Sequence, residues 1–289
     1  MKRCKHWLIQ ATDRHALGVS ASASLLTLQL AVHHGLRTLL VEYNLAQASM
    51  DVLFAQQYHL IRYQAGSSSD TQASGWEVLM RFARAGSLTR DMVTASAIAL
   101  YPRLDLLRIS NEDRDMQDEE EVMGYNRATQ RVISLLTESY DVILWDLGQR
   151  KSVIVPMQMH EQVAGMIHVI PQNNHAWNLD GMDGRDQRST HVGVQIGLIP
   201  MHDQRLTFNV RNLRRRHRST PMFAIPYDPV LRNRACEGAL MTYYLRLKHE
   251  AERGRPHPVY SSLAEIASFM MAESGSIPAA SWGEGRRWG

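Results

Sequence analysis

The residues best placed to do chemistry follow the first apolar run. Residues 7–11 (WLIQA) lead into 12–22 (TDRHALGVSAS) and then into a helical pattern. Such a strand–loop–helix unit can hold a phosphate, because the first turn of a helix presents free N–H groups. A working P-loop adds several glycines, a lysine for the phosphates and a hydroxyl for Mg²⁺. Here Gly18 is the only glycine and there is no lysine, so these residues alone also fit an ordinary turn.

The other chemically active residue types form no recognised catalytic or metal-binding pattern. The thirteen histidines include no His-Glu-x-x-His motif, and two cysteines, Cys4 and Cys236, are too few for a disulfide framework or a zinc site. No Gly-x-Ser-x-Gly sequence marks a nucleophilic serine. We therefore expect no catalytic residue of these kinds, and no metal other than Mg²⁺ carried by a bound nucleotide.

The stretch 205–218 is a second candidate site because it is strongly basic. Leu206, Val210 and Leu213 recur there at helical spacing and can face a core. The arginines would then form a solvated or partner-binding face, represented by Arg211, Arg214, Arg215 and Arg218. The alternative is that this face binds phosphates of DNA or an anionic membrane without sequence preference.

An alternation of strands and helices must position these candidates. Apolar runs predict strands at 7–11, 37–42, 104–109, 141–146, 165–170, 193–199 and 221–225, and helical patterns lie at 20–34, 75–84, 87–99, 118–139, 203–217, 229–249 and 260–272. Several of the strands lack polar alternation, which is typical of a parallel sheet covered on both faces. We expect a three-layer α/β fold with a mostly parallel sheet, in a single domain over 1–273. Residues 64–75 predict a surface loop, and 274–289 a disordered tail.

Composition favours a cytoplasmic protein. The net charge is only +3, with 28 arginines against four lysines, which does not by itself indicate nucleic acid. No apolar run approaches the roughly 18 residues that span a bilayer, and the N-terminus has no apolar signal-peptide core. Leu263, Ile266, Ala267 and Met270 form an apolar stripe on a late helix. A membrane-surface helix would carry Lys or Arg opposite such a stripe, so we expect this helix to dock on the sheet.

Several segments, in order, resemble the MinD/ParA family of deviant-Walker ATPases. Residues 30–35 (LAVHHG) are similar to its LA-x-x-x-G helix end, 36–44 (LRTLLVEYN) to its VLLIDxD strand and 45–54 to the segment that follows. Residues 140–148 (YDVILWDLG) are similar to its YDxVIxDxPxG switch region, 164–170 to its DxVLLVxxP strand, and 225–228 with 234–238 to its IPxD…A…G ending. The closest subset is the TadZ/CpaE-like pilus-assembly proteins. The resemblance implies a P-loop NTPase fold of the SIMIBI/MinD-like type.

The resemblance also implies which residues would meet a nucleotide, namely Gly18, Ser20, Ser22, Asp146 and Asp228. Counting back from Gly35 puts Ser20 in the slot of the P-loop lysine, Ala21 and Ser22 in the two threonine slots, and His15 in the place of the signature lysine. A register shifted by one residue puts Arg14 there instead. In either register the P-loop lysine is missing. Without it, charge on transferring phosphoryl oxygens loses a main stabiliser.

Further departures weaken the expected nucleotide chemistry. Glu42 and Asn44 stand where the family has two aspartates, and an amide orients an attacking water less well than a carboxylate. The adenine-reading asparagine expected after the strand at 193–199 is replaced near Pro200. Asp146 remains as the Walker B-like carboxylate.

We therefore expect a non-catalytic MinD/ParA-like scaffold or positioning protein of a cell-envelope machine, such as a pilus or secretion apparatus. It would bind either no cofactor or ATP or ADP weakly with Mg²⁺, form a homodimer and contact protein partners, at the inner face of the membrane or elsewhere in the cytoplasm. Two alternatives remain open. One is a slow ATPase that uses Arg14 or Lys151, and the other is a DNA-associated partition-like protein that uses the face at 205–218.

Overall fold

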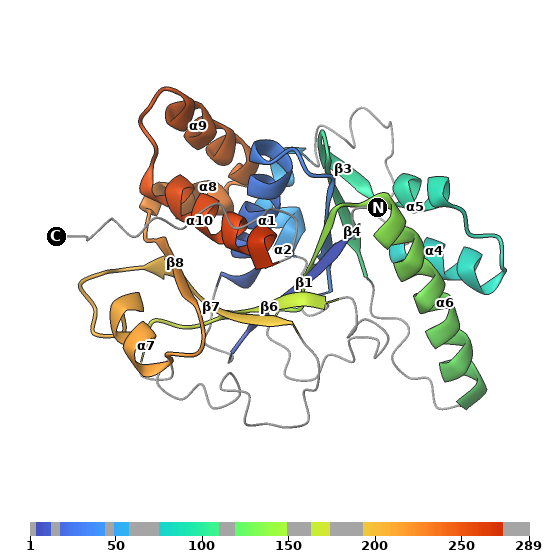
Figure 1. Cartoon of the computed structure of the whole chain (residues 1–289). Coiled ribbons are helices and arrows are strands. Elements are labelled where there is room, and N and C mark those ends of the chain that lie inside the picture. Colours follow the sequence, from blue (N-terminus) through green and yellow to red (C-terminus); the bar gives the residue numbers. More distant parts are fainter. Residues whose placement is uncertain are drawn as a thin grey trace.

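The strands that the structure describes form one sheet. The computed structural model describes residues 4–12, 18–43, 49–57, 75–109, 119–148, 163–173 and 193–273. In these ranges eight strands lie in the order β3-β4-β2-β5-β1-β6-β7-β8, and every neighbouring pair is parallel except β3 with β4 (Figure 1). Their bounds are β1 Lys5–Ala11, β2 Thr38–Glu42, β3 Ile98–Tyr101, β4 Leu104–Arg108, β5 Val142–Asp146, β6 Val163–Val169, β7 Val194–His202 and β8 Met222–Pro226.

Helices cover both faces of this sheet, as the sequence predicts. One face carries α1 (Val19–Leu28), its π-helical continuation η1 (Gln29–His33), α2 (Ser49–Leu53), α8 (Pro229–Cys236), α9 (Leu240–Glu252) and α10 (Pro258–Glu273) (Figure 1). The other carries α4 (Gly75–Arg84), α5 (Arg90–Ser96) and α6 (Glu119–Ser139). Alternate residues of β1 face opposite sides. Trp7 and Ile9 belong to the hydrophobic core that contains α1, and Leu8 belongs to the core that contains α4 and α6. The three-layer α/β fold with a mostly parallel sheet is therefore confirmed.

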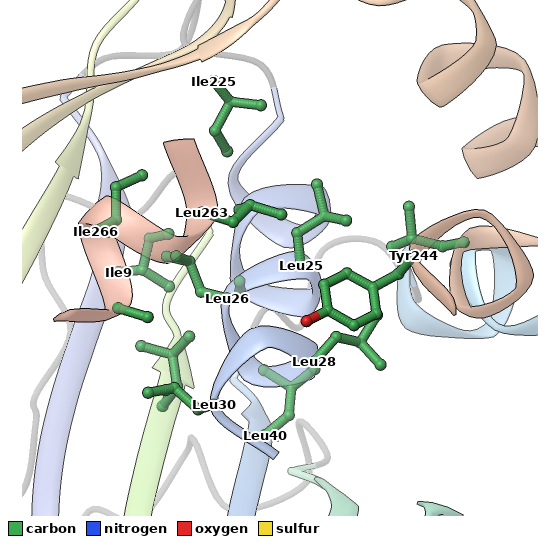
Figure 2. Close-up of a cluster of buried hydrophobic side chains, with 14 of the residues drawn as sticks. Ile9, Leu25, Leu26, Leu28, Leu30, Leu40, Ile225, Tyr244, Leu263 and Ile266 are labelled. Carbon is green, nitrogen blue, oxygen red and sulfur yellow. The ribbon is translucent and has the colours of Figure 1, made fainter. Parts of the chain in front are cut away.

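Helix α1 occupies the centre of the larger core. Every residue from Ser22 to Leu28 is buried, which explains why its sequence is apolar and small on all sides rather than amphipathic. Figure 2 shows its leucines among Ile9 of β1, Leu40 of β2, Leu263 of α10 and, across the helix from Ile9, Tyr244 of α9. The stripe predicted on the last helix is also buried, at 1% exposure or less, so its docking on the sheet is confirmed.

Two predicted helices begin or end elsewhere because of local capping and pairing. The pattern at 87–99 contains α5, which Thr89 caps, and then β3, which pairs with β4 across a turn at Pro102 and Arg103. The pattern at 203–217 becomes a helix, α7 (Val210–Arg216), only after Asn209, whose Oδ1 accepts the Asn212 N–H at 3.0 Å. Leu206 precedes that helix and is 46% exposed, so its expected core position was wrong.

The predicted helix at 229–249 is broken in two at Gly238. This glycine lies between α8 and α9 with a φ of +69°, and its carbonyl accepts the Gln56 N–H at 3.2 Å. The chain can approach α2 this closely because there is no side chain at 238. The short helix α2, for its part, was not predicted. The predicted loop at 64–75 falls outside the described residues except for Gly75, which begins α4, and the tail at 274–289 also lies outside them.

We expect Gly238→Ala to destabilise the protein more than Gly254→Ala does. Both glycines follow a helix and have left-handed φ, +69° and +75°, where alanine costs about 1–2 kcal/mol. A Cβ at 238 would also lie 2.4 Å from the Ala55 Cβ and 2.8 Å from the Val52 carbonyl oxygen, whereas one at 254 would meet nothing within 4 Å. Urea unfolding measures both variants. Equal losses of unfolding free energy in the two variants would contradict the close approach of Gly238 to α2.

Candidate functional site

The candidate nucleotide site lies where β1, β2 and β5 end. Strand β5 pairs with β1 and with β2, so that Asp146 lies in register with Ile9 and with Glu42. Helix α1 follows β1 on the same edge and begins after Gly18. The fold thus brings Ser20, two residues after Gly18, into contact with Asp146. Ser22 lies two residues beyond Ser20 in α1 and is buried. Asp228 follows β8, the last strand in the order of the sheet.

Gly18 is closed off by a proline from β7. Gly18 has a φ of +87° and lies directly before α1, where its carbonyl accepts the Ser22 N–H at 2.9 Å. A Cβ on Gly18 would lie 3.3 Å from the Cβ and the Cγ of Pro200. Pro200 is near the position where the family resemblance calls for an adenine-reading asparagine. In this chain Pro200 packs against the N-terminus of α1 instead.

Asp146 is a fully buried carboxyl group with an incomplete set of partners. Its Oδ1 accepts the Gly148 N–H at 2.9 Å, while Oδ2 is buried with no hydrogen-bond partner of its own among the described residues. Burial raises the pKa of Asp146 to about 6, against the lowering effect of hydrogen bonds from the Ser20 hydroxyl and the Gly148 N–H. The carboxyl therefore holds a charge at neutral pH at an energetic cost.

The contact between Ser20 and Asp146 favours the second of the two P-loop registers. In P-loop proteins the Ser or Thr after the lysine and the Walker B aspartate hold the same Mg²⁺, so they lie close together. Here Ser20 interacts with Asp146, and Gly18 precedes it as in the Gly-Lys-Ser/Thr pattern. Val19, which is 5% exposed, then occupies the lysine slot. Arg14, the residue this register puts in place of the signature lysine, lies outside the described residues.

Asp146 and Ser20 fit the cation-binding part of a nucleotide site, but the start of α1 does not fit the phosphate-binding part. An unpartnered carboxylate oxygen and a hydroxyl are oxygen ligands of the kind that Mg²⁺ prefers. The phosphate half needs a cation at the start of the helix, and the structure has a buried valine there. Among the described residues no group of three or more His, Cys, Asp or Glu side chains could hold a metal ion by itself. Asp146 and Ser20 would therefore need a phosphate oxygen or water to complete a coordination shell.

Glu42 is committed to structural contacts. It is 3% exposed, its Oε1 accepts the Met50 N–H of α2 at 3.0 Å, and its Oε2 lies 3.1 Å from Nε of Arg108. The side chain thus joins the ends of β2 and β4 to the start of α2. Sequence reasoning missed this ion pair, because β2 and β4 are neighbours only in the folded sheet. Asn44 lies outside the described residues.

Asp228 likewise caps a helix. Its Oδ1 accepts the Val230 N–H at 2.7 Å at the start of α8, and its Oδ2 accepts the Tyr243 hydroxyl, with His257 Nε2 at 3.7 Å. Both carboxylate oxygens are therefore engaged within the protein. The Asp-Pro sequence at 228–229 is itself a signal for a helix start, and it could have predicted this role.

The basic stretch does not form one uniform face. Arg214 donates from Nε and Nη2 to the Met222 carbonyl of β8, at 2.9 and 2.6 Å. Arg211, Arg215 and Arg218 are exposed and make no hydrogen bond or ion pair within the part of the chain that the structure describes. Arg214 is thus tied to the sheet, and the other three remain available to a partner.

We expect Asp146→Asn to stabilise the protein increasingly as the pH rises. The folded pKa of about 6 lies above the reference value of 3.8, so the aspartate costs nothing below about pH 4 and its full cost appears above about pH 6. The difference between the two values corresponds to about 3 kcal/mol. Asparagine keeps the acceptor for Gly148. Urea unfolding at pH 4 and pH 7.5 measures the effect, and an equal difference at both values would contradict the burial of an unpaired charge.

Comparison with known proteins is informative only at the level of structure. No protein-family model and no curated protein matches the chain. A ParA family ATPase from Chlorobium tepidum TLS matches with a TM-score of 0.62 and 12% identity over 93% of this chain and 99% of that one. The septum site-determining protein MinD from Pyrococcus horikoshii OT3, complexed with Mg-ADP, matches with a TM-score of 0.60 and 15% identity over 92% and 95%.

A third solved structure is similar over almost the whole chain. The MinC:MinD cell division protein complex of Aquifex aeolicus matches with a TM-score of 0.62 and 13% identity over 97% of this chain and 100% of that one. Among the helices that the structure describes, none has the length and apolar character of a bilayer span. The mostly parallel sheet, its helical layers and these neighbours show that the chain has the P-loop NTPase fold of the MinD/ParA-type ATPases.

Proposed function

We propose that this chain is a non-catalytic scaffold or positioning protein, built on the MinD/ParA fold in one domain over 1–273. It would act through protein contacts in a cell-envelope machine such as a pilus or secretion apparatus, from the cytoplasm or the inner face of the membrane, as TadZ/CpaE-like proteins do. The neighbours include a MinC:MinD complex, which shows that a protein of this fold can bind another protein.

The observation that carries the proposal is the buried valine at the head of α1. Val19 follows Gly18 in the place of the P-loop lysine and is 5% exposed, and Pro200 packs against the glycine before it. A neutral aliphatic side chain cannot compensate the several negative charges of a triphosphate. The nearby charged group, Asp146, is itself an acid and repels phosphate unless a cation lies between them. Backbone N–H groups at the helix start can still hold a phosphate weakly.

Exposed apolar side chains support a dimer that needs no nucleotide. Val52, Leu206, Tyr227 and Val230 are between 40% and 53% exposed. Leu206 and Tyr227 follow the carboxyl ends of β7 and β8, and α2, which carries Val52, packs against α8, which carries Val230. Apolar groups of this kind are enriched in the centres of protein interfaces. We propose that they contribute to a homodimer at the carboxyl edge of the sheet.

We expect no ATP hydrolysis above background from the purified chain, alone or with duplex DNA or anionic lipid vesicles, because the lysine that stabilises the transferring phosphoryl group is absent. Release of phosphate from γ-labelled ATP measures this directly. Asp146→Ala, purified in parallel, is the control for contaminating ATPases. Turnover in the unmodified protein that this variant loses would overturn the proposal.

The dimer prediction has a matched pair of variants. Sedimentation should show a dimer whose dissociation constant is the same with and without Mg·ATP. Val230→Glu, which places a charge among the apolar residues at the carboxyl edge, should shift the equilibrium toward monomer by roughly tenfold or more. Met123→Glu makes the same change at a residue of α6 that is 58% exposed, on the other side of the sheet, and should leave the dimer intact. A monomer that dimerises only with ATP would contradict the prediction.

One observation favours a slow ATPase as the second candidate. The cation half of the site is present, since Ser20 interacts with Asp146 and Oδ2 of Asp146 has no hydrogen-bond partner of its own among the described residues. A cation supplied from elsewhere, such as Arg14 or Lys151, would have to replace the missing lysine. Both of these residues lie outside the described ranges, and the hydrolysis assay above decides between the two candidates.

A partition-like role on DNA has the three exposed arginines in its favour. Phosphate contacts make affinity fall steeply with salt. If Arg211, Arg215 and Arg218 hold DNA, binding to random duplex should be tight at low salt and lost on changing them to Glu. The scaffold proposal predicts weak DNA binding at most, because Arg214, which lies between Arg211 and Arg215 in the chain, is bonded to the Met222 carbonyl.

A further inference from the structure

A pocket lies at the other end of β7 and β8 from the candidate nucleotide site. Its volume is about 520 Å³, within the range typical of ligand sites. It is lined by Arg214 of α7, by Arg218 in the segment between α7 and β8, and by Glu265 and Phe269 of α10. The first residues of β8 form part of its lining. No residue of this pocket belongs to the candidate nucleotide site.

The start of β8, the last described strand of the sheet, lines part of this pocket. Strand β8 is the last strand of the sheet, and the Pro221 carbonyl accepts the Gly197 N–H of β7 at 2.8 Å. Because backbone groups alternate along a strand, the N–H and C=O of Met222 face away from β7. The carbonyl is taken by the Arg214 guanidinium. Met222 is 1% exposed, so the edge is covered there, and this bond holds the Arg214 guanidinium in the lining of the pocket.

The pocket carries charged groups of both signs. Arg218 and Glu265 make no hydrogen bond or ion pair among the described residues. The Arg214 guanidinium is held in place by its two bonds to Met222, which leaves its other N–H groups for a ligand. A guanidinium is the donor best matched to a carboxylate. With two arginines against one glutamate, the pocket favours an acidic ligand that also offers N–H donors to Glu265.

Aromatic rings supply the apolar part of the lining. The rings of Phe223 and Phe269 have centroids 5.2 Å apart with an interplanar angle of 58°. Such a surface accepts an aromatic or aliphatic side chain. Nucleic acid fits less well, because Glu265 would repel phosphates and a sugar–phosphate backbone offers it no N–H donor.

We propose that this pocket binds an extended segment of a partner protein that combines acidic side chains with an aromatic or aliphatic one. Arg218, with Arg214 beside it, binds the carboxylate of the segment, Phe223 and Phe269 contact its apolar side chain, and Glu265 accepts N–H groups of its backbone. The inference rests on the scaffold proposal only in that it expects a protein partner. ATP turnover by the unmodified chain would overturn the scaffold proposal and leave this pocket untouched.

The test is a selection of random linear twelve-residue peptides on the full chain, followed by fluorescence anisotropy of the enriched peptide. We expect a consensus with Asp or Glu next to an aromatic or aliphatic residue. Arg218→Glu should weaken binding by roughly tenfold or more, because it removes the carboxylate partner. Arg215→Glu makes the same change of charge in the same basic stretch, outside the pocket, and should change the affinity by less than about twofold. Thermal unfolding verifies that both variants are folded.

Three outcomes would overturn the proposal. The first is the absence of any enriched consensus, or a basic one. The second is equal loss of binding in Arg218→Glu and Arg215→Glu, which would indicate attraction by net charge alone. The third is displacement of the peptide by random duplex DNA at micromolar concentration, which would assign the surface to nucleic acid.

Discussion

The burial of helix α1 is the constraint on which the rest of the structure depends. From Ser22 to Leu28 every residue is enclosed between the sheet and the helices α9 and α10. A helix packed on all sides at the density of a protein interior cannot rotate or slide without opening cavities. Its first turn is therefore fixed against the end of β5, where Ser20 meets Asp146. The same packing fixes Val19, the residue that we propose stands in place of the P-loop lysine.

This arrangement separates two requirements that a nucleotide site normally meets together. The oxygen ligands for a cation are present in Asp146 and Ser20, and the buried charge of Asp146 is costly without a partner. The positive charge for the phosphates is missing from α1. Glu42, which lies in register with Asp146, is paired with Arg108 and hydrogen-bonded to the start of α2. Glu42 therefore serves the fold at this edge, whereas the buried charge of Asp146 costs stability.

The sequence predicted the structure correctly where burial alone sets the pattern of apolar residues. The unalternated apolar strands and the stripe on α10 predicted a covered parallel sheet and a docked last helix, because both signals come from burial alone. It failed where two signals compete. Ile98–Tyr101 continues a helical pattern but pairs with β4, and the helical pattern at 229–249 is broken by one glycine that must approach α2. The P-loop register could not be settled from the sequence, because only the contact between Ser20 and Asp146 distinguishes the two alignments. Nothing in the spacing of the arginines indicated that Arg214 is bonded to a backbone carbonyl of β8.

The affinity of the chain for Mg·ATP tests the central claim most directly. Isothermal titration of the unmodified protein and of Asp146→Ala, each with Mg·ATP and with Mg²⁺ alone, separates the phosphate half of the site from the cation half. The absence of a lysine at the head of α1 predicts a dissociation constant of about 1 mM or weaker for Mg·ATP, corresponding to about −4 kcal/mol. Submicromolar binding of Mg·ATP that Asp146→Ala abolishes would contradict the account, because it would show that this chain holds a triphosphate without that lysine.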